Sequence, residues 1–341
     1  MRILYLTDQY LDYLSDEVLY GLRILLGENV VDFPKKEILY QNSRNKIPSS
    51  MVWGNGATAF GLPDISVDRN DIEKKINTGY FDLIINSNCW RIHSPVYKNL
   101  VVLDGQDHHF LNPTYLGKVI AYFKRELMWE VKDVQPIQFA LPDHLVNDSV
   151  VPKIKLTHAS FSLSPGLRQE ISDLYGSRLI HDWREYILDI KQSWFAISPK
   201  GAGYDCQRHY EILGNAVLCI YLNSRAPRIL REQFVDGINC LTFNSINELK
   251  HKIDSCKNPE MLIERGRQSL HEHHLSNCRA KQLLESVHSL NGAHRRYHFF
   301  SSIRYGYVPY YSNEIVERVI QKFRNSIFRT AGNRTETART E

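Results

Sequence analysis

Residues 193–222, which read SWFAISPKGAGYDCQRHYEILGNAVLCIYL, bring together residue types that could bind an anionic ligand. An apolar run is interrupted by Gly201 and Gly203, which permit a tight turn and a close approach of the backbone to a ligand. Three polar residues then follow, namely Asp205, Arg208 and Glu211. If a helix begins after the glycines, its free N–H groups and partial positive charge would attract a phosphate group.

Arg208 and Glu211 fit that interpretation in different ways. A cation in the first turn of a helix opposes the helix dipole, so Arg208 is better explained by a bound anion. Glu211 lies one turn further on, where a carboxylate could accept hydrogen bonds from the two vicinal hydroxyls of a ribose. The alternative is an ordinary loop followed by a solvated ion pair at helical spacing. Spacing alone leaves both interpretations open.

A second candidate group follows the apolar run 101–103. In an open α/β sheet, ligands bind beyond the carboxyl ends of the strands, which makes Asp104, Asp107 and His108 candidate site residues. Asp8 and Asp12 follow another predicted strand in the same way. A polar loop with solvated carboxylates is the alternative for each of them.

Short apolar runs alternate with amphipathic segments along the chain, a pattern typical of βαβ units around a parallel sheet. The predicted strands are 2–7, 29–33, 83–86, 100–103, 153–162, 194–198, 217–222 and 240–243. The predicted helices are 15–26, 69–78, 164–176, 181–193, 208–216, 246–256, 259–290 and 312–329. Residues 134–153 contain three prolines and little periodicity, which places a domain boundary there.

The bulk composition excludes several classes of protein. Hydrophobic residues make up 43% of the 341 residues and charged residues 23%, as in a globular protein. The formal net charge of +4 is compatible with anionic ligands without requiring a nucleic acid. The six cysteines form no paired spacing, which favours reduced thiols in the cytoplasm. The N-terminus is too acidic for a signal peptide, and no apolar segment is long enough to span a membrane.

The C-terminal half resembles that of GT-B glycosyltransferases. The resemblance rests on ISPKGAGYDCQRHYEILGNAVLCIYL, FVDGINCLTFNSINELKHKI and HHLSNCRAKQLL, and covers roughly residues 153–290. It is strongest to the family-1-like group that includes the spore-maturation enzymes, and more distant to the exostosin-like enzymes. In the first half, LDGQD, YFKREL and PIQFALP are similar to pieces of the same group.

The resemblance implies two Rossmann-like domains facing a central cleft. Residues 1–145 would form the acceptor-side domain and residues 153–300 the domain that binds the nucleotide sugar. Residues 301–341 would form a C-terminal helix that crosses back to the first domain, followed by a flexible tail. The implied reaction transfers a sugar from a nucleotide diphosphate sugar to an acceptor hydroxyl, with neither a metal ion nor a cofactor.

The resemblance also assigns roles to residues. It places Glu211 on the ribose and Arg208 on the diphosphate. The loop at Gly201 and Gly203 would stabilise the charge of the leaving diphosphate. Further donor-binding candidates are Lys200, Arg168 and Asp205. A catalytic base would come from the first domain, and the candidates are Asp104, Asp107 and His108.

One feature departs from the family pattern, and two other functions stay open. The second glutamate that many retaining GT-B enzymes carry seven residues away is absent, since those positions hold Tyr204 and Leu218. The stereochemical outcome is therefore open. The alternatives are a non-catalytic nucleotide-binding partner of the same fold, and a glycosyltransferase that modifies nucleic acid, which the modest charge does not favour. The expected location is the cytoplasm, with the inner membrane surface as a peripheral option.

Overall fold

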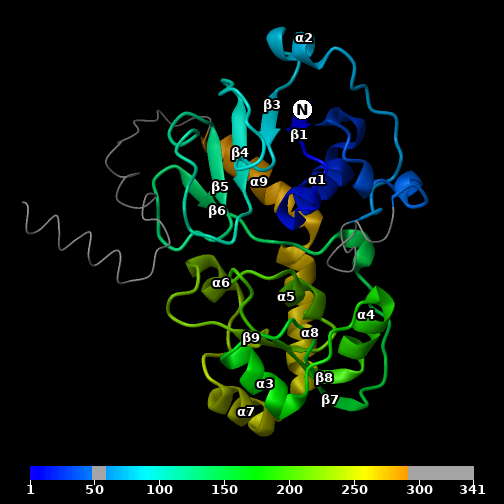
Figure 1. The fold of residues 1–341 in the computed structure, drawn as a ribbon, viewed down its shortest axis with the longest axis vertical. Helices are drawn as coiled ribbons and strands as arrows, with labels where there is room; N and C mark the ends of the chain where they lie inside the picture. Colours follow the sequence, from blue (N-terminus) through cyan, green and yellow to red (C-terminus); the bar gives the residue numbers. More distant parts are fainter. Residues whose placement is uncertain (48–58, 291–341) are drawn as a thin grey trace, which may run out of the picture.

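The computed structural model describes residues 1–47 and 59–290. Its N-terminal half is built on a six-stranded parallel sheet with the strand order β2-β1-β3-β4-β5-β6 (Figure 1). The strands are β1 (Ile3–Leu6), β2 (Val30–Phe33), β3 (Leu83–Asn86), β4 (Leu100–Asp104), β5 (Ala121–Lys124) and β6 (Val134–Pro136). Helix α1 (Tyr13–Leu26) connects β1 to β2, and the short helix α2 (Ile72–Asn77) precedes β3.

The strands of this sheet are apolar along their whole length because both faces are covered. Ile3 and Tyr5 of β1 enter one core, whereas Leu4 between them enters a second core on the opposite face. Asp12 caps α1 by accepting a hydrogen bond from the backbone nitrogen of Ser15 at 3.2 Å. Such a cap supplies a partner for one of the free N–H groups at the start of a helix.

The C-terminal half holds a four-stranded parallel sheet with the order β10-β9-β8-β7. Its strands are β7 (Lys155–His158), β8 (Ser193–Ser198), β9 (Val217–Tyr221) and β10 (Leu241–Phe243). Its helices are α3 (Leu167–Tyr175), α4 (Trp183–Lys191), α5 (Gln207–Ile212), α6 (Arg228–Gln233), α7 (Ile246–Ser255) and α8 (Pro259–Ser269). A capping box starts α7, because Ser245 accepts from the backbone of Glu248 and the Glu248 carboxylate accepts from the backbone of Asn244.

One helical rod connects the two halves. After α8 a π-helical turn (Leu270–His274) leads into α9 (Ser276–Leu290), which packs along α1 (Figure 1). The single helix predicted for residues 259–290 is therefore two helices joined by a turn. The chain crosses between the halves a second time at Leu141, whose backbone pairs with His274 and Ser276.

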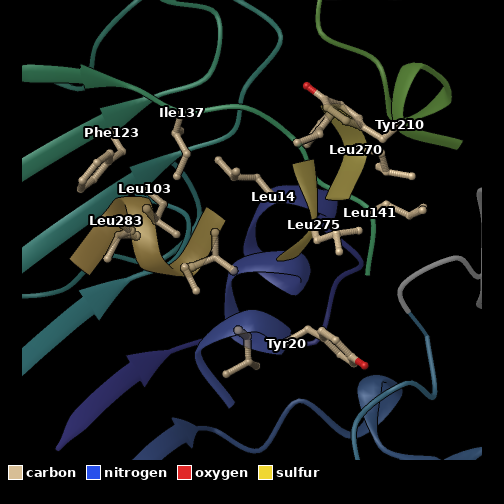
Figure 2. Packing of buried hydrophobic residues seen from close by; sticks show 14 of the residues in the cluster. Leu14, Tyr20, Leu103, Phe123, Ile137, Leu141, Tyr210, Leu270, Leu275 and Leu283 are labelled. Carbon is tan, nitrogen blue, oxygen red and sulfur yellow. The ribbon is translucent and has the colours of Figure 1, made fainter. Parts of the chain in front are cut away.

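The hydrophobic core continues through this crossing. Leu14 of α1, Leu103 of β4 and Leu283 of α9 pack together in the first half, as Figure 2 shows. The same cluster extends through Leu275 to Tyr210 of α5 in the second half. Because these side chains are buried against both halves, separating the halves would expose apolar surface to water.

Most predicted elements are present at nearly the predicted positions, including β1 to β4, β8 and β9. Strand β7 is shorter than the predicted run 153–162, and strands β5 and β6 and helix α6 were not predicted. The predicted helix 312–329 and the segment 301–341 lie outside the described residues. Within the described part, no helix is sufficiently long and apolar to cross a membrane.

Candidate active site

Three cavities lie around the loop that follows β8. The largest, of about 1180 Å³, is lined by residues of both halves. A second cavity of about 340 Å³ lies between the first-half strand ends and the loop, and a third of about 410 Å³ lies between the loop and the start of α3. Ala202 lines all three cavities. The predicted glycine loop is therefore the point where these spaces meet.

Gly203 is fixed against the first half of the chain. A Cβ atom at this position would overlap the carboxylate of Glu126, which follows β5. That carboxylate accepts hydrogen bonds from the backbone nitrogen of Asp205 at 2.9 Å and from Arg125 at 3.0 Å. Glycine is needed here because a carboxylate from the other domain occupies the space of a side chain.

Arg125 joins the same contact and is buried. It donates to the carbonyl oxygens of Gly105 at 2.9 Å and Asp205 at 2.5 Å, and its guanidinium lies 4.4 Å from the centre of the Phe139 ring. Arg125 also forms an ion pair with Asp107. One arginine thus links the loop after β4 to the glycine loop after β8.

Two guanidinium groups lie beside each other at the end of β8. Arg168 and Arg208 are 5.9 Å and 5.8 Å from the centre of the same ring, that of Phe161. Burial lowers the pKa of Arg168, and the neighbouring charge of Arg208 lowers it further. Neither arginine forms an ion pair with a carboxylate of the described chain. Two like charges held together in this way favour the binding of an anion between them.

Both arginines hold the loop as well as carrying charge. Arg168 donates two hydrogen bonds to the carbonyl oxygen of Lys200, and Arg208 donates to the Ser198 hydroxyl and the Pro199 carbonyl. The Lys200 ammonium lies 4.3 Å from the centre of the Tyr204 ring. Lys200 also lines both the largest cavity and the 410 Å³ cavity.

Helix α5 is shorter than the predicted 208–216, because it ends at Ile212 and the chain turns at Gly214. Gly214 has a φ of 76°, and a Cβ atom there would lie 2.9 Å from the side chain of Arg267. A six-residue helix has a weaker dipole than the prediction assumed. The anion site therefore depends on Arg168, Arg208 and Lys200 rather than on the helix N-terminus.

Glu211 lies on α5 and is only 7% exposed. Its Oε2 atom accepts a hydrogen bond from the Tyr186 hydroxyl at 2.8 Å. Burial raises the pKa of the Glu211 carboxyl to about 7, although Tyr186 and Arg208 both favour the ionised form. The charge of Glu211 also contributes to the raised pKa of Tyr13, so the carboxylate is close to the start of α1. Neither Glu211 nor Arg208 lines any of the three cavities.

Both carboxylate oxygens of Asp205 accept hydrogen bonds from other residues of the chain. Oδ1 accepts from the Tyr210 hydroxyl at 2.7 Å, and Oδ2 accepts from the backbone nitrogen of Phe139 at 2.8 Å. Asp205 lines the 340 Å³ cavity, but its carboxylate serves to fasten the glycine loop to the chain crossing near residue 139. This geometry fits a positioning role better than a direct contact with the donor.

The Asp104 carboxylate also accepts several hydrogen bonds within the protein, and it is fully buried. It accepts from Lys124 at 2.8 Å, Tyr122 at 2.6 Å and the Trp90 indole at 2.9 Å. With a buried ammonium and two other donors already in place, the carboxylate has little capacity to accept a proton from a substrate. Its evident role is to hold the end of β4.

Asp107 and His108 are accessible. The Asp107 side chain is 57% exposed and lines both the largest cavity and the 340 Å³ cavity. His108 lines the largest cavity only, and it packs edge to face against Trp90 with ring centres 5.0 Å apart. Burial, together with the charge of Lys124, lowers the pKa of His108, so its imidazole is neutral at pH 7.

Comparison with known proteins gives a structural likeness only. No family model matches the chain, and no curated protein matches it. A glycosyltransferase from Rickettsia africae is similar over 86% of this chain and 99% of its own, with 11% identity and a TM-score of 0.51. AviGT4, a glycosyltransferase involved in avilamycin A biosynthesis, is similar over 86% and 99%, with 11% identity and a TM-score of 0.50. Anabaena HepE in complex with UDP-glucose is similar over 85% and 100%, with 12% identity and a TM-score of 0.48.

The chain has the GT-B fold. The predicted α/β class, with two Rossmann-like domains facing a cleft, is thereby confirmed. Figure 1 shows the six-stranded sheet and the four-stranded sheet in separate halves of the molecule. The largest cavity is lined by residues of both halves.

Sequence reasoning missed the residues that join the two domains of this GT-B chain. Arg125 and Glu126 lie directly after β5, in the segment YFKREL that resembles a piece of the family. Asn88 and Arg91, which line the 340 Å³ cavity with Asp12, follow β3. All four positions satisfy the strand-end rule that identified Asp104. Among the described residues, no group of three or more His, Cys, Asp or Glu side chains is arranged to hold a metal ion.

Proposed function

We propose that this protein is a glycosyltransferase that moves a sugar from a nucleoside diphosphate sugar to an acceptor hydroxyl without a metal ion. The observation that carries the proposal is the meeting of three cavities at Ala202, where Lys200 and Arg168 are lining residues and Arg208 packs on the same Phe161 ring as Arg168. Within the described chain none of these three cations forms an ion pair with a carboxylate. The similar structures with TM-scores of 0.51 and 0.50 are described as glycosyltransferases, and the proposal extends that description to this chain.

The donor would bind on the C-terminal side. Arg168, Arg208 and Lys200 would hold the diphosphate. Its two phosphate groups would supply the counter-charge for these cations. The backbone N–H groups from Gly201 to Gly203 would face the same group. Glu211 would accept hydrogen bonds from the ribose hydroxyls when it is ionised.

The base would be Asp107. In the reaction the acceptor oxygen forms a bond to the anomeric carbon of the donor sugar, and the bond from that carbon to the diphosphate oxygen breaks. The acceptor proton passes to a carboxylate, and the diphosphate leaves with the bonding electrons. Asp107 is favoured because it lines both cavities that reach the end of β4, whereas His108 lines one of them and Asp104 is fully buried.

A thermal-shift panel of nucleoside diphosphates and their sugars tests the donor site. A ligand that binds only the folded state adds about 2.7 kcal/mol at one hundred times its dissociation constant. We expect at least one nucleoside diphosphate to raise the melting temperature, and the double variant R168Q/R208Q to lose most of that shift. The variant R184Q/R265Q removes the same charge from α4 and α8, away from the three cavities, and should keep it.

The outcomes separate the proposal from its rivals. If no nucleoside diphosphate stabilises the protein, the donor site is wrong. Binding without hydrolysis of any donor sugar, and without transfer, would identify a non-catalytic nucleotide-binding partner instead. A steep loss of DNA or RNA binding with added salt would support the nucleic-acid-modifying alternative.

The cytoplasmic location, and a peripheral position at the inner membrane surface, belong to the same proposal. All six cysteines are free thiols in the described chain, which agrees with a reducing compartment. A cell-fractionation experiment with full-length protein would test both options.

A further inference from the structure

The largest cavity has an aromatic side that the donor proposal does not use. His108, His109 and Phe110 follow β4, and Trp129 follows β5. The ring centres of His109 and Trp129 are 5.2 Å apart with the planes at 90°, and those of His109 and Phe110 are 4.6 Å apart. Trp129 is 50% exposed, so part of its ring surface is available to a ligand in the cavity.

This aromatic side carries no charge of its own at neutral pH. Burial and the charge of Lys124 lower the pKa of both His108 and His109. Neutral imidazoles can donate and accept hydrogen bonds beside the aromatic faces. The two acidic residues of the cavity, Asp107 and Glu126, are both paired with Arg125.

Besides Lys200, the C-terminal domain contributes two arginines to the same cavity. Arg225 precedes α6 and Arg231 lies on it, and both are exposed. Arg231 donates to the Ala226 carbonyl at 3.1 Å, but neither side chain has a carboxylate partner in the described chain. Arg228, between them in sequence, does have partners, since it pairs with Glu130 and Glu232 and does not line the cavity. Of these three arginines, the two without a carboxylate partner among the described residues are the two that line the cavity, as Lys200 also does.

We propose that the largest cavity binds an anionic saccharide as the acceptor. One face of its sugar ring would pack on the side chains of Phe110 and Trp129, and its carboxylate, phosphate or sulfate group would pair with Arg225 and Arg231. The C–H bonds on one face of a pyranose suit an aromatic ring, and guanidinium groups match planar or tetrahedral oxyanions. The inference rests on the proposed function, because the saccharide is the acceptor of the same reaction.

Two other ligands for these arginines are less well supported. The donor diphosphate has its own cations at Arg168, Arg208 and Lys200, and of these only Lys200 also lines the largest cavity. A nucleic acid would need a charged track along which its backbone could run. The cavity is instead lined by one cluster of aromatic rings and by two arginines that lack acidic partners in the described part of the chain.

Ligand-observed NMR titration of the full chain would test the proposal with four probes: glucose, glucuronic acid, glucose 6-phosphate and inorganic phosphate. The titration is run with and without the nucleoside diphosphate that gives the largest thermal shift. We expect the two anionic sugars to bind about tenfold or more tightly than glucose, because each charge-assisted hydrogen bond adds affinity. Inorganic phosphate alone should bind more weakly than glucose 6-phosphate.

Three variants locate the contacts. R225Q/R231Q should remove the preference for anionic sugars and leave glucose binding unchanged. Trp129→Ala should weaken all three sugars by a similar factor, and the charge-matched R184Q/R265Q should change none of them. Because these residues are exposed, their variants are expected to fold, and the melting temperature of each checks this.

Several results would overturn the inference. Equal binding of glucose and the anionic sugars would remove the role of the arginines, and equal binding of phosphate and glucose 6-phosphate would remove that of the aromatic side. Loss of the nucleotide thermal shift in R225Q/R231Q would assign the arginines to the donor. Displacement of the sugar by a short oligonucleotide would assign the cavity to nucleic acid. If no nucleoside diphosphate binds but the anionic sugars are still preferred, the proposed function is contradicted and the saccharide site is still supported.

Discussion

At the end of β4 the protein pairs its charges with one another, whereas the cations at the end of β8 have no carboxylate partner among the described residues. Asp104 meets Lys124 there, and Asp107 meets Arg125. Near the end of β8, Arg168 and Arg208 donate to backbone carbonyls and a hydroxyl, and the Lys200 ammonium lies over the Tyr204 ring. The buried Asp104–Lys124 pair forms a fixed frame, whereas the exposed Asp107 lines two cavities. The cations at β8 favour an incoming anion. Both regions lie at strand ends, so position in the fold does not by itself distinguish structure from function.

The largest expected effect comes from two carboxylates three residues apart. Asp107→Asn removes the proposed base and should lower donor turnover about 10²–10⁴-fold with little change in stability. Asp104→Asn should instead lower the stability, with a smaller effect on donor turnover, because it leaves the Lys124 ammonium buried without its counter-charge. Hydrolysis of the preferred donor sugar and denaturant unfolding would be measured on both variants. If both variants lose activity and stability to the same extent, Asp107 and Asp104 do not have the different roles proposed for them.

Lys124→Met tests the buried Asp104–Lys124 ion pair by removing its cation. Burial lowers the pKa of Lys124, and Asp104 partly offsets this. Removing the cation leaves a fully buried carboxylate unpaired, which costs about 3–5 kcal/mol of unfolding free energy. Urea denaturation would measure the loss, and the exposed Lys250→Met serves as the control. A loss below about 1 kcal/mol, the range of an exposed pair, would contradict the proposed importance of the pair.

Glu211→Gln should change how stability depends on pH. The pKa of Glu211 is raised to about 7, so its contribution is fully present below its unfolded pKa and is lost as the pH rises through about 7. Wild type should lose roughly 3 kcal/mol from this group between about pH 4.5 and pH 8, and the variant should not. Unfolding free energies of both proteins at pH 5 and pH 8 give the comparison. The same pH dependence in the two proteins would show that Glu211 is not the group responsible.

The smallest expected effect comes from the glycine loop. Gly203→Ala forces its Cβ atom against the Glu126 carboxylate, and such overpacking costs about 1–3 kcal/mol. Gly201→Ala meets the Cys206 sulfur at 3.0 Å and should cost less. Melting temperatures of the two variants, with donor hydrolysis alongside, would rank them. If Gly201→Ala proves the more harmful, the loop is not held by Glu126 as described.

The sequence predicted the elements of this molecule better than the contacts between them. Apolar runs such as 83–86 and 217–222 identify buried strands because both faces of a parallel sheet are covered. The break at 270–274 was missed because its residues continue the helical pattern, and only the pairing of Leu141 with His274 and Ser276 requires the turn. Local patterns carry no information about such distant partners.

For the candidate site, too, the sequence predicted residues better than the contacts between them. Residue types and spacing identified the glycine loop, Arg208 and Glu211, which are near one another in sequence. They could not show that Asp104 is buried or that Glu126 fills the space beside Gly203, because both facts depend on side chains from other elements. The roles of the site residues in catalysis stay predictions until the variants above are measured.

The packing of α9 on α1 has a consequence for how the protein is made. The first 140 residues leave the ribosome with the apolar face of α1 bare, since the helix that covers it begins at Ser276. Domains that are continuous in sequence can fold as they are synthesised, but this one must wait for the second to be translated. We expect nascent chains that end before residue 276 to bind chaperones through that face, and to be released once residues 276–290 emerge.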